Sequence, residues 1–309
     1  MHEILTIGSA VIDVFITSGH FVVNQTGETA LLCQTYGEKV EVESMNLCAG
    51  GGASNTAIGF TRAGSTAALI TELGKDVFSQ IITDTLHTEF VRTNFLIQQR
   101  KEQTGGSVIM VGKDGGRTIM VYRGASSQLD PSDISETAIM RAEWIHLSSI
   151  SGRLETLREI GRFAHQGNKN ISWNPGRGEL ELLSSGQLSL DTLPVSVLFM
   201  NYSEWMMVGE LHDQLRRTIP EIIITNGGKN GVLYRGTSDA NTLSFSPLPA
   251  QVVDETGAGD AFAVGYVTAK RHGESSDSAI QWALRNSQSV VQHIGATAGL
   301  LSLERLSGV

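Results

Sequence analysis

Short apolar runs alternate with amphipathic segments along most of the chain. The first run, residues 4–7, is followed by residues 53–63, where the apolar side chains fall at helical spacing and Gly64 closes the segment. Later apolar runs with the length of buried strands occupy residues 67–71, 144–147, 170–173, 195–200 and 222–225. Amphipathic helical patterns occupy residues 154–165, 202–208, 258–271 and 276–293. This alternation predicts an α/β fold with a central, mostly parallel sheet flanked by helices.

Two stretches depart from this pattern. Residues 13–47 and 94–122 lack helical periodicity and contain short alternating segments such as LLCQTYGEKVEVESM and GGRTIMVYRG. We expect them to form a small β-sheet that grows out of the main domain as a lid. The core is then expected to comprise residues 1–12, 48–93 and 123–309.

Composition narrows the class of protein. The 309 residues are 40% hydrophobic and 18% charged, which is ordinary for a soluble globular protein. The net charge of −9 offers no basic stripe, so we expect no nucleic-acid partner. No apolar run reaches the length of about 18 residues needed to span a membrane, and the N-terminus lacks a signal-peptide pattern. Cys33 and Cys48 lack metal-binding spacing. We expect reduced thiols, no membrane partner and a cytoplasmic location.

The strongest chemical signal is DETGAGD at residues 254–260, between a short strand and an apolar helix. Gly257 and Gly259 let backbone N–H groups approach a phosphate closely, and a helix N-terminus favours an anion. Asp260 can accept the proton of a substrate hydroxyl that attacks a phosphate. Taken alone, the segment fits equally well an N-capped helix with an aspartate in its first turn.

The segment resembles the second signature of the ribokinase, or PfkB-type carbohydrate kinase, family, written D-T-x-G-A-G-D. Glu255 is a departure, at a position that we regard as variable. The resemblance implies that Asp260 is the catalytic base. It also implies that the amides of Gly257, Ala258 and Gly259 bind the transferring phosphoryl group, with ATP and Mg²⁺ as the donor.

A second motif opens the first helix. Gly50 and Gly51 precede Asn55 and resemble the family's first signature, a glycine pair followed by Asn. Asp13 resembles the family's N-terminal aspartate, which holds substrate hydroxyls. A carboxylate and a carboxamide together suit polyol recognition, although a flexible turn and a solvated Asp would show the same residues. We expect these four residues to bind the phosphoryl acceptor.

Further motifs follow in the family's order. Asn201 and Glu204 resemble its N-x-x-E motif, which organises magnesium through water, although a helix cap fits equally well. By the same resemblance Asp254 and Thr256 are candidates for a monovalent cation such as K⁺. The resemblance also implies nucleotide-binding roles for the residues of a glycine-rich loop and of a C-terminal helix, namely Thr225, Gly227, Gly228, Gly231 and Asn286.

These motifs predict an ATP-dependent kinase that phosphorylates a hydroxyl of a small sugar or polyol. The GxxxxGK(S/T) loop is absent from the sequence, which excludes a Walker-type kinase. A nucleoside kinase of the same family is one alternative, since Phe15, Phe21 or Tyr36 could stack on a base. A catalytically silent sugar-binding relative is another, which has no need of Asp260. We also expect a homodimer joined through the lid, because exposed strand edges are often covered.

Overall fold

A computed structural model describes residues 2–27, 29–98, 100–112 and 116–308 of the chain. Residues 28, 99 and 113–115 of the expected lid, and residues 1 and 309 of the expected core, lie outside the described residues. None of the described helices combines the length and the apolar composition needed to cross a membrane.

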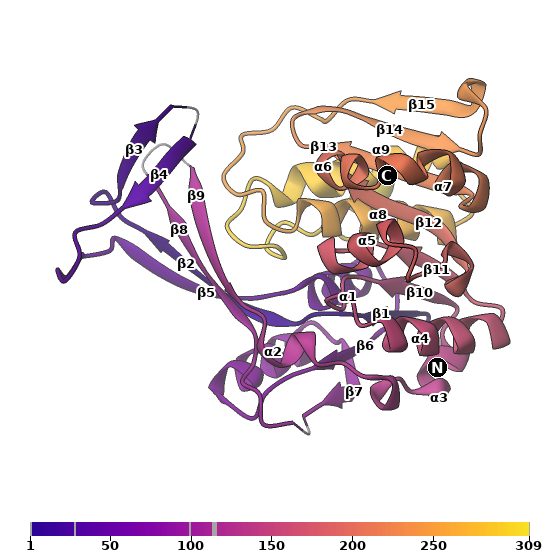
Figure 1. Ribbon diagram of the computed structural model, residues 1–309, viewed down its shortest axis with the longest axis horizontal. Helices are drawn as coiled ribbons and strands as arrows, with labels where there is room; N and C mark the ends of the chain where they lie inside the picture. Colours follow the sequence, from indigo (N-terminus) through magenta and orange to yellow (C-terminus); the bar gives the residue numbers. More distant parts are fainter. Residues whose placement is uncertain (1, 28, 99, 113–115, 309) are drawn as a thin grey trace.

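The largest element of the fold is a sheet through the middle of the molecule (Figure 1). Its strands are β1 (Ile4–Ile7), β6 (Ala67–Glu72), β7 (Arg92–Ile97), β10 (Trp144–Leu147), β11 (Asn170–Trp173), β12 (Val195–Asn201), β13 (Glu221–Asn226), β14 (Lys229–Arg235) and β15 (Thr242–Phe245). In the described part of the chain they lie in the order β15-β14-β13-β12-β11-β10-β1-β6-β7. Neighbours from β7 to β13 are parallel, and β14 and β15 are added antiparallel at one edge. The predicted mostly parallel sheet is confirmed.

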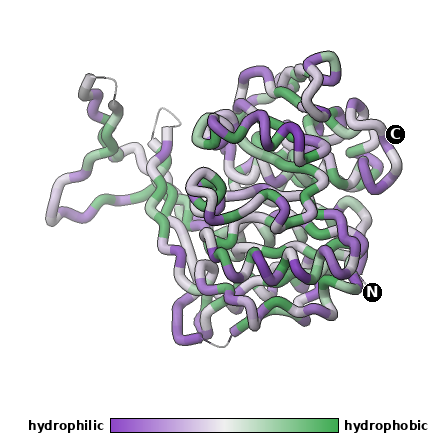
Figure 2. The backbone as a smooth tube through the Cα atoms, turned by 45° about the vertical axis from the view of Figure 1, so that its right-hand side comes forward, coloured by the Kyte–Doolittle hydropathy of each residue, from purple (hydrophilic) through white to green (hydrophobic). Residues whose placement is uncertain are grey.

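Both faces of this sheet are covered, which explains why its strands are continuous apolar runs. All four residues of β1 are buried; Ile4 packs into one hydrophobic cluster, whereas Leu5 and Ile7 pack into a second cluster. Figure 2 shows the hydrophobic positions concentrated along the central strands. The alternation of side chains between the two faces of a strand thus gives the protein two cores, one on each side of the sheet.

Two sets of helices complete the two cores. One cluster contains residues of α1 (Gly52–Arg62), α2 (Val77–Thr88), α8 (Ala258–Arg271), α9 (Ser276–Val290) and α10 (Leu303–Ser307). The other contains residues of α3 (Glu136–Arg141), α4 (Leu154–Gln166), α5 (Arg177–Ser184), α6 (Tyr202–Met207) and α7 (His212–Thr218). In α4 the buried Leu157, Ile160, Gly161 and Ala164 recur at helical spacing, so one stripe faces the core. Short 3₁₀ turns occupy Gly124–Ser127, Pro131–Asp133, Leu190–Thr192, Gly209–Leu211 and Asp239–Asn241.

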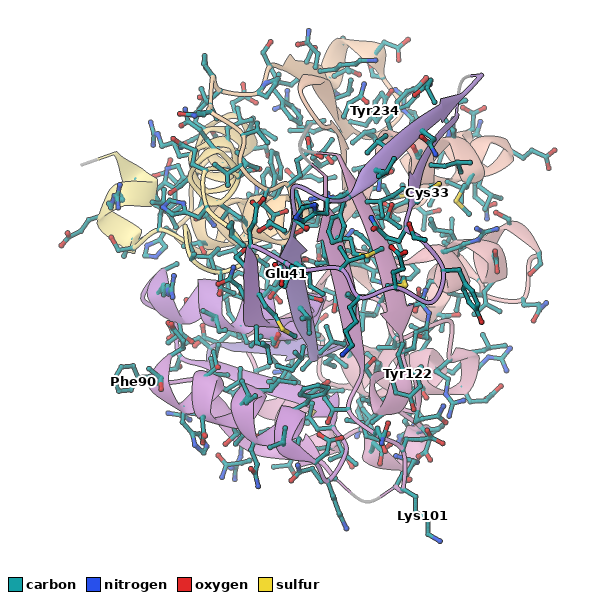
Figure 3. All side chains as sticks on the ribbon, turned by 90° about the vertical axis from the view of Figure 1, so that its left-hand side faces the viewer. Cys33, Glu41, Phe90, Lys101, Tyr122 and Tyr234 are labelled. Carbon is teal, nitrogen blue, oxygen red and sulfur yellow. The ribbon has the colours of Figure 1, made fainter. Side chains whose placement is uncertain are left out.

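A smaller sheet stands out from one side of the core (Figure 1). It consists of β2 (Val11–Thr17), β5 (Ser44–Gly50), β8 (Gly106–Val111) and β9 (Arg117–Tyr122), in the order β5-β2-β8-β9. A separate hairpin of β3 (Val22–Thr26) and β4 (Thr29–Cys33) extends beyond it. We refer to these two sheets together as the lid. In Figure 3, which views the molecule from the lid side, Cys33 lies in the lid, Glu41 lies in the segment that joins β4 to β5, and Tyr122, at the end of β9, lies lower.

The expected lid boundaries need correction. The range 94–122 begins too early, because residues 94–97 belong to β7, which pairs with β6 in the large sheet. The range 13–47 is too narrow, because β2 already begins at Val11 and β5 continues to Gly50. β7 has an alternating burial pattern at the edge of the large sheet, and this alternation is what made it resemble a lid strand.

Candidate active site

Asp260 lies in the first turn of α8, next to the beginning of α1. The Asn55 Nδ2 donates a hydrogen bond to Asp260 Oδ2 at 2.8 Å. Burial raises the pKa of Asp260 to about 6, a rise that the Asn55 hydrogen bond opposes and the negative charge of Asp13 reinforces. A carboxylate with a pKa close to neutrality can take up a proton during a reaction at physiological pH.

The turn before Asp260 presents backbone N–H groups. Gly257 has a φ of 76°, and a Cβ there would lie 2.4 Å from the Ala296 Cβ, so only glycine fits. The Ala258 N–H, one of the three amides expected to bind the phosphoryl group, instead donates to the Glu255 carbonyl at 3.2 Å. Within the described ranges, the N–H groups of Gly257, Gly259 and Asp260 have no protein acceptor. Three free donors at the start of a helix form a site for an anion.

Asp13 lies in the lid strand β2, on a small cavity of about 270 Å³. It is 8% exposed, and the Ser107 Oγ of the neighbouring strand donates to its Oδ1. Burial raises the pKa of Asp13 despite that hydrogen bond, and the negative charge of Asp254 acts in the same direction. A Cβ at Gly50 would lie 2.0 Å from the Asp13 Oδ2, so glycine is needed there for this carboxylate to take its position.

Gly51 completes the turn between β5 and α1. Its φ is 93°, and a Cβ there would lie 2.6 Å from the Ser9 carbonyl oxygen. The turn brings α1, and with it Asn55, against Asp260. The Asn55 Oδ1 is buried and has no hydrogen-bond partner among the described residues. A buried acceptor of this kind can receive a hydrogen bond from a ligand hydroxyl.

A larger cavity of about 620 Å³ lies on the other side of the DETGAGD turn. Ala258 and Gly259 line it, whereas Thr256 of the same turn lines the cavity beside Asp13. The walls of the larger cavity combine a glycine-rich loop, a proline-rich segment and residues of α9, including Thr225, Gly227, Gly228, Pro247, Pro249, Ser287 and Gln288. We refer to the two cavities as the large and the small cavity. The turn that carries Asp260 therefore contacts both.

Asn201 and Glu204 form a reciprocal cap at the start of α6. The Asn201 Oδ1 accepts from the Glu204 N–H at 2.9 Å, and the Glu204 Oε2 accepts from the Asn201 N–H at 2.8 Å. Asn201 lines the large cavity. Burial raises the pKa of Glu204, opposed by its hydrogen bonds with Asn201. The helix-cap alternative therefore describes the local contacts of this pair.

Residues 1–303 match the sequence profile of the pfkB family of carbohydrate kinases. The chain belongs to the pfkB carbohydrate kinase family. Ribokinase of Bacillus subtilis is 25% identical over 306 residues, which cover 97% of this chain and 96% of the relative. Fructokinase of Escherichia coli is 28% identical, with 72% of this chain and 76% of the relative covered. This pfkB protein is therefore an ATP-dependent kinase of the sugar and nucleoside kinase class.

Solved structures share the fold over the whole chain. The nucleoside kinase of Methanocaldococcus jannaschii matches with a TM-score of 0.80 and 23% identity, covering 100% of this chain and 99% of that chain. Ribokinase of Arabidopsis thaliana, complexed with ribose and ATP, matches with a TM-score of 0.79 and 20% identity, covering 99% and 98%. The ribokinase-like fold expected from the sequence is confirmed.

Most of the expected site residues of this pfkB protein lie around the two cavities and the turn between them, but Gly231 and Asn286 do not. Gly231 does not line the large cavity; it pairs with Phe245, and a Cβ there would lie 2.4 Å from that ring. The fully buried Asn286 donates to the Ala261 carbonyl and accepts from the Leu301 N–H. Both residues therefore support the packing around the cavity, and the neighbouring Ser287 lines it instead.

Asp254 and Thr256, the expected cation ligands, already share other contacts. The Asp254 Oδ1 accepts from the Thr256 N–H at 3.0 Å, from the Thr256 Oγ1 at 2.7 Å and from the Arg117 guanidinium at 2.7 Å. The Asp254 Oδ2 accepts from the Gly295 N–H at 2.9 Å. The positive charge beside Asp254 thus comes from the lid strand β9.

Sequence reasoning missed several residues that shape the two cavities. Ser107 orients Asp13, yet a serine in an alternating strand carries no distinctive signal. Pairing of β8 with β2 could have placed it there, because cross-strand partners share a face. The segment from Pro247 to Val252 borders the large cavity but has neither periodicity nor a recognised motif. Its role depends on the path of the chain between β15 and α8.

Proposed function

We propose that this pfkB protein transfers the γ-phosphoryl group of ATP to a hydroxyl of a small sugar or polyol. The observation that carries the proposal is the Asp260 carboxylate, held by Asn55 at a turn that contacts both cavities. The large cavity is the proposed site of ATP and the small cavity that of the acceptor. This division agrees with their volumes of about 620 and 270 Å³, since a nucleotide is larger than a monosaccharide.

In the proposed reaction, Asp260 removes the proton of the acceptor hydroxyl as its oxygen forms a bond to the γ-phosphorus. The bond from that phosphorus to the bridging oxygen of ATP breaks, and ADP leaves with the electron pair. The N–H groups of Gly257, Gly259 and Asp260, which have no acceptor among the described residues, would donate to the charged oxygens of the transferring phosphoryl group. Asp13 and the Asn55 Oδ1 accept hydrogen bonds from other hydroxyls of the acceptor.

Mg²⁺, when bound, would neutralise charge on the ATP phosphates. Within the part of the chain that the structure describes, no three His, Cys, Asp or Glu side chains gather into a metal site. In this proposal phosphate oxygens and water would supply most of the ligands of Mg²⁺, and the nearby protein groups would be Asn201, which lines the large cavity, and its hydrogen-bond partner Glu204.

The nucleoside alternative finds less support in the small cavity. Phe15 and Phe21 are 3% and 8% exposed, so their rings are used in packing and are not free to stack on a base. Tyr36 is fully exposed and does not line the cavity. Among the described residues that line the small cavity, Tyr122 is the aromatic one. Its ring could stack on a base, so nucleosides are included among the acceptors to be assayed.

A coupled assay of ADP release tests this proposal. The purified protein is screened with ATP, Mg²⁺ and a panel of pentoses, hexoses, sugar acids and nucleosides, and kcat/KM is compared across the panel. We expect a sugar to exceed every nucleoside. If adenosine, cytidine or inosine exceeded all sugars by about a hundredfold, the sugar assignment would be wrong. Absence of acceptor-dependent ADP release throughout the panel would favour the catalytically silent alternative.

We further propose that a second copy of the chain covers the outer face of the lid. Cross-strand pairing places Leu47, Val14, Val108 and Met120 in one row, on the face opposite Asp13. Leu47 and Met120 are 45% and 52% exposed, so the row presents adjacent apolar side chains to the outside. Light scattering should give a dimer mass for the wild type and a monomer mass for Met120→Asp. The exposed Met207→Asp on α6 is the matched control, and a monomeric wild type would contradict the proposal.

A further inference from the structure

The contact between Arg117 and Asp254 joins the lid to the phosphate-binding turn. Arg117 is the first residue of β9, and its partner Asp254 begins the DETGAGD segment, 137 residues further along the chain. The guanidinium lies 2.7 Å from the Asp254 Oδ1, 3.3 Å from the Thr256 Oγ1 and 3.7 Å from a carboxylate oxygen of Glu255. It also lines the large cavity. One side chain thus contacts three successive residues that lead into the anion site.

These contacts are incompatible with a monovalent cation bound by Asp254 and Thr256. The carboxylate of Asp254, the charged ligand of that expected site, accepts four hydrogen bonds, and its side chain is 7% exposed. Three of these hydrogen bonds converge on the Oδ1, which therefore has no acceptor position left, and the Oδ2 already accepts from the Gly295 N–H. The guanidinium also supplies a full positive charge at this place, and a second cation beside it would be repelled. The residues present therefore do not fit K⁺.

Resting on the proposed kinase function, we propose that Arg117 is a positioning residue that takes the place of a monovalent cation. It neutralises Asp254 and holds the turn that carries the free N–H groups of Gly257, Gly259 and Asp260. Because Arg117 belongs to the lid, it can neutralise Asp254 and hold the turn only when β9 lies against the core. Phosphoryl transfer by this chain is therefore independent of K⁺, unlike that of an enzyme whose anion site is organised by the ion.

The test compares the wild type with Arg117→Gln, Arg117→Lys and the control Arg177→Gln. Arg177 forms an exposed pair with Glu181 on α5, so its loss should have little effect. Rates are measured in KCl and in tetramethylammonium chloride at one ionic strength of about 100 mM, so that screening stays constant. Melting temperatures are recorded in the same two salts, because an ion that binds the folded state raises them without any need for turnover.

For the wild type, Arg117→Lys and Arg177→Gln, we expect each protein's rate and melting temperature to be the same in KCl as in tetramethylammonium chloride. Arg117→Gln should lose about 10- to 100-fold in kcat/KM, the range for residues that orient a site through another group. It should then recover part of this activity, and gain stability, in KCl alone, because the vacated oxygens of Asp254 and Thr256 can accept an ion. A merely structural arginine would not produce recovery that depends on K⁺.

Two results would overturn this inference. One is a wild-type rate that is severalfold higher in KCl than in tetramethylammonium chloride, or a wild-type melting temperature that is several degrees higher in KCl. The other is an Arg117→Gln variant with wild-type kinetics in both salts. Failure of the kinase proposal is separable, since it would appear as no acceptor-dependent ADP release by the wild type. The melting temperatures would still show whether Arg117 excludes the ion.

Discussion

Around the small cavity, polar side chains hold one another in place. Ser107 donates to Asp13 across two lid strands, and Asn55 donates to Asp260 between two helices. The large cavity is lined chiefly by glycine, proline and apolar side chains, among them Gly227, Gly228, Pro247, Leu248 and Pro249. In the proposed arrangement, backbone groups and cavity shape recognise ATP, whereas fixed side chains are needed where Asp260 takes up a proton. We therefore expect substitutions that disturb Asp260 or Asp13 to act more strongly than a substitution of Glu204 on the proposed nucleotide side.

The largest effect is expected for Asp260→Asn. Loss of the base should lower kcat by about 10²-fold or more while KM for ATP stays nearly unchanged. The melting temperature at neutral pH should be equal or higher, since folding raises the pKa of Asp260 to about 6 and so disfavours its ionised form. Steady-state kinetics and thermal melts check both statements. Normal turnover in this variant would remove Asp260 from the mechanism.

Gly50→Ala should follow, because the new Cβ would lie 2.0 Å from the Asp13 Oδ2 and displace that carboxylate. We expect kcat/KM for the acceptor to fall by up to about 10²-fold, the cost of misplacing a binding group by about an ångström. Gly209→Ala is the matched control, since a Cβ there meets no atom within 4 Å. Equal kinetics for the two variants would show that Asp13 does not position the acceptor.

A smaller effect is expected for Asn55→Ala. Its amide stabilises the ionised Asp260 and so holds the pKa of that carboxyl down. Without it, the acidic limb of the pH profile of kcat/KM should move to higher pH, with about a tenfold loss at neutral pH for one charge-assisted hydrogen bond. An unshifted limb would mean that the 2.8 Å contact has no influence on the base.

The smallest of these effects is expected at the nucleotide side. Glu204→Gln should raise the Mg²⁺ concentration needed for half-maximal rate about severalfold, with kcat at saturating Mg²⁺ unchanged. Gln can keep the cap with Asn201, so α6 should remain folded. A Mg²⁺ titration that coincides with that of the wild type would leave Glu204 with the role of a helix cap alone.

Local patterns and long-range contacts differ in how far the sequence predicts them. Residues 4–7, 144–147 and 258–271 were predicted with the observed bounds, since continuous apolar runs and helical spacing reflect burial directly. β7 was assigned to the lid because its alternating pattern at a sheet edge is the same as that of a lid strand.

The candidate site divides in the same way. Asp260, Gly257 and Asn55 stand in motifs at the starts of α8 and α1, and the packing of these two helices against each other brings them together. Arg117 contacts Asp254 across 137 residues, and neither residue's immediate sequence indicates the other. Asn286 was expected to bind the nucleotide, whereas the structure shows it fully buried and hydrogen-bonded to the backbone of Ala261 and Leu301. The sequence alone does not distinguish these two uses of an asparagine.

The pH dependence of kcat/KM for the preferred acceptor tests the central claim most directly. Asp260 acts only when it is deprotonated, and its pKa is raised to about 6, so the rate should fall as the pH drops through that value. The slope should approach one decade per pH unit, and the limb should vanish in the residual activity of Asp260→Asn. A wild-type rate that stays level down to about pH 4.5, below which an unperturbed aspartate titrates, would contradict a base with a raised pKa.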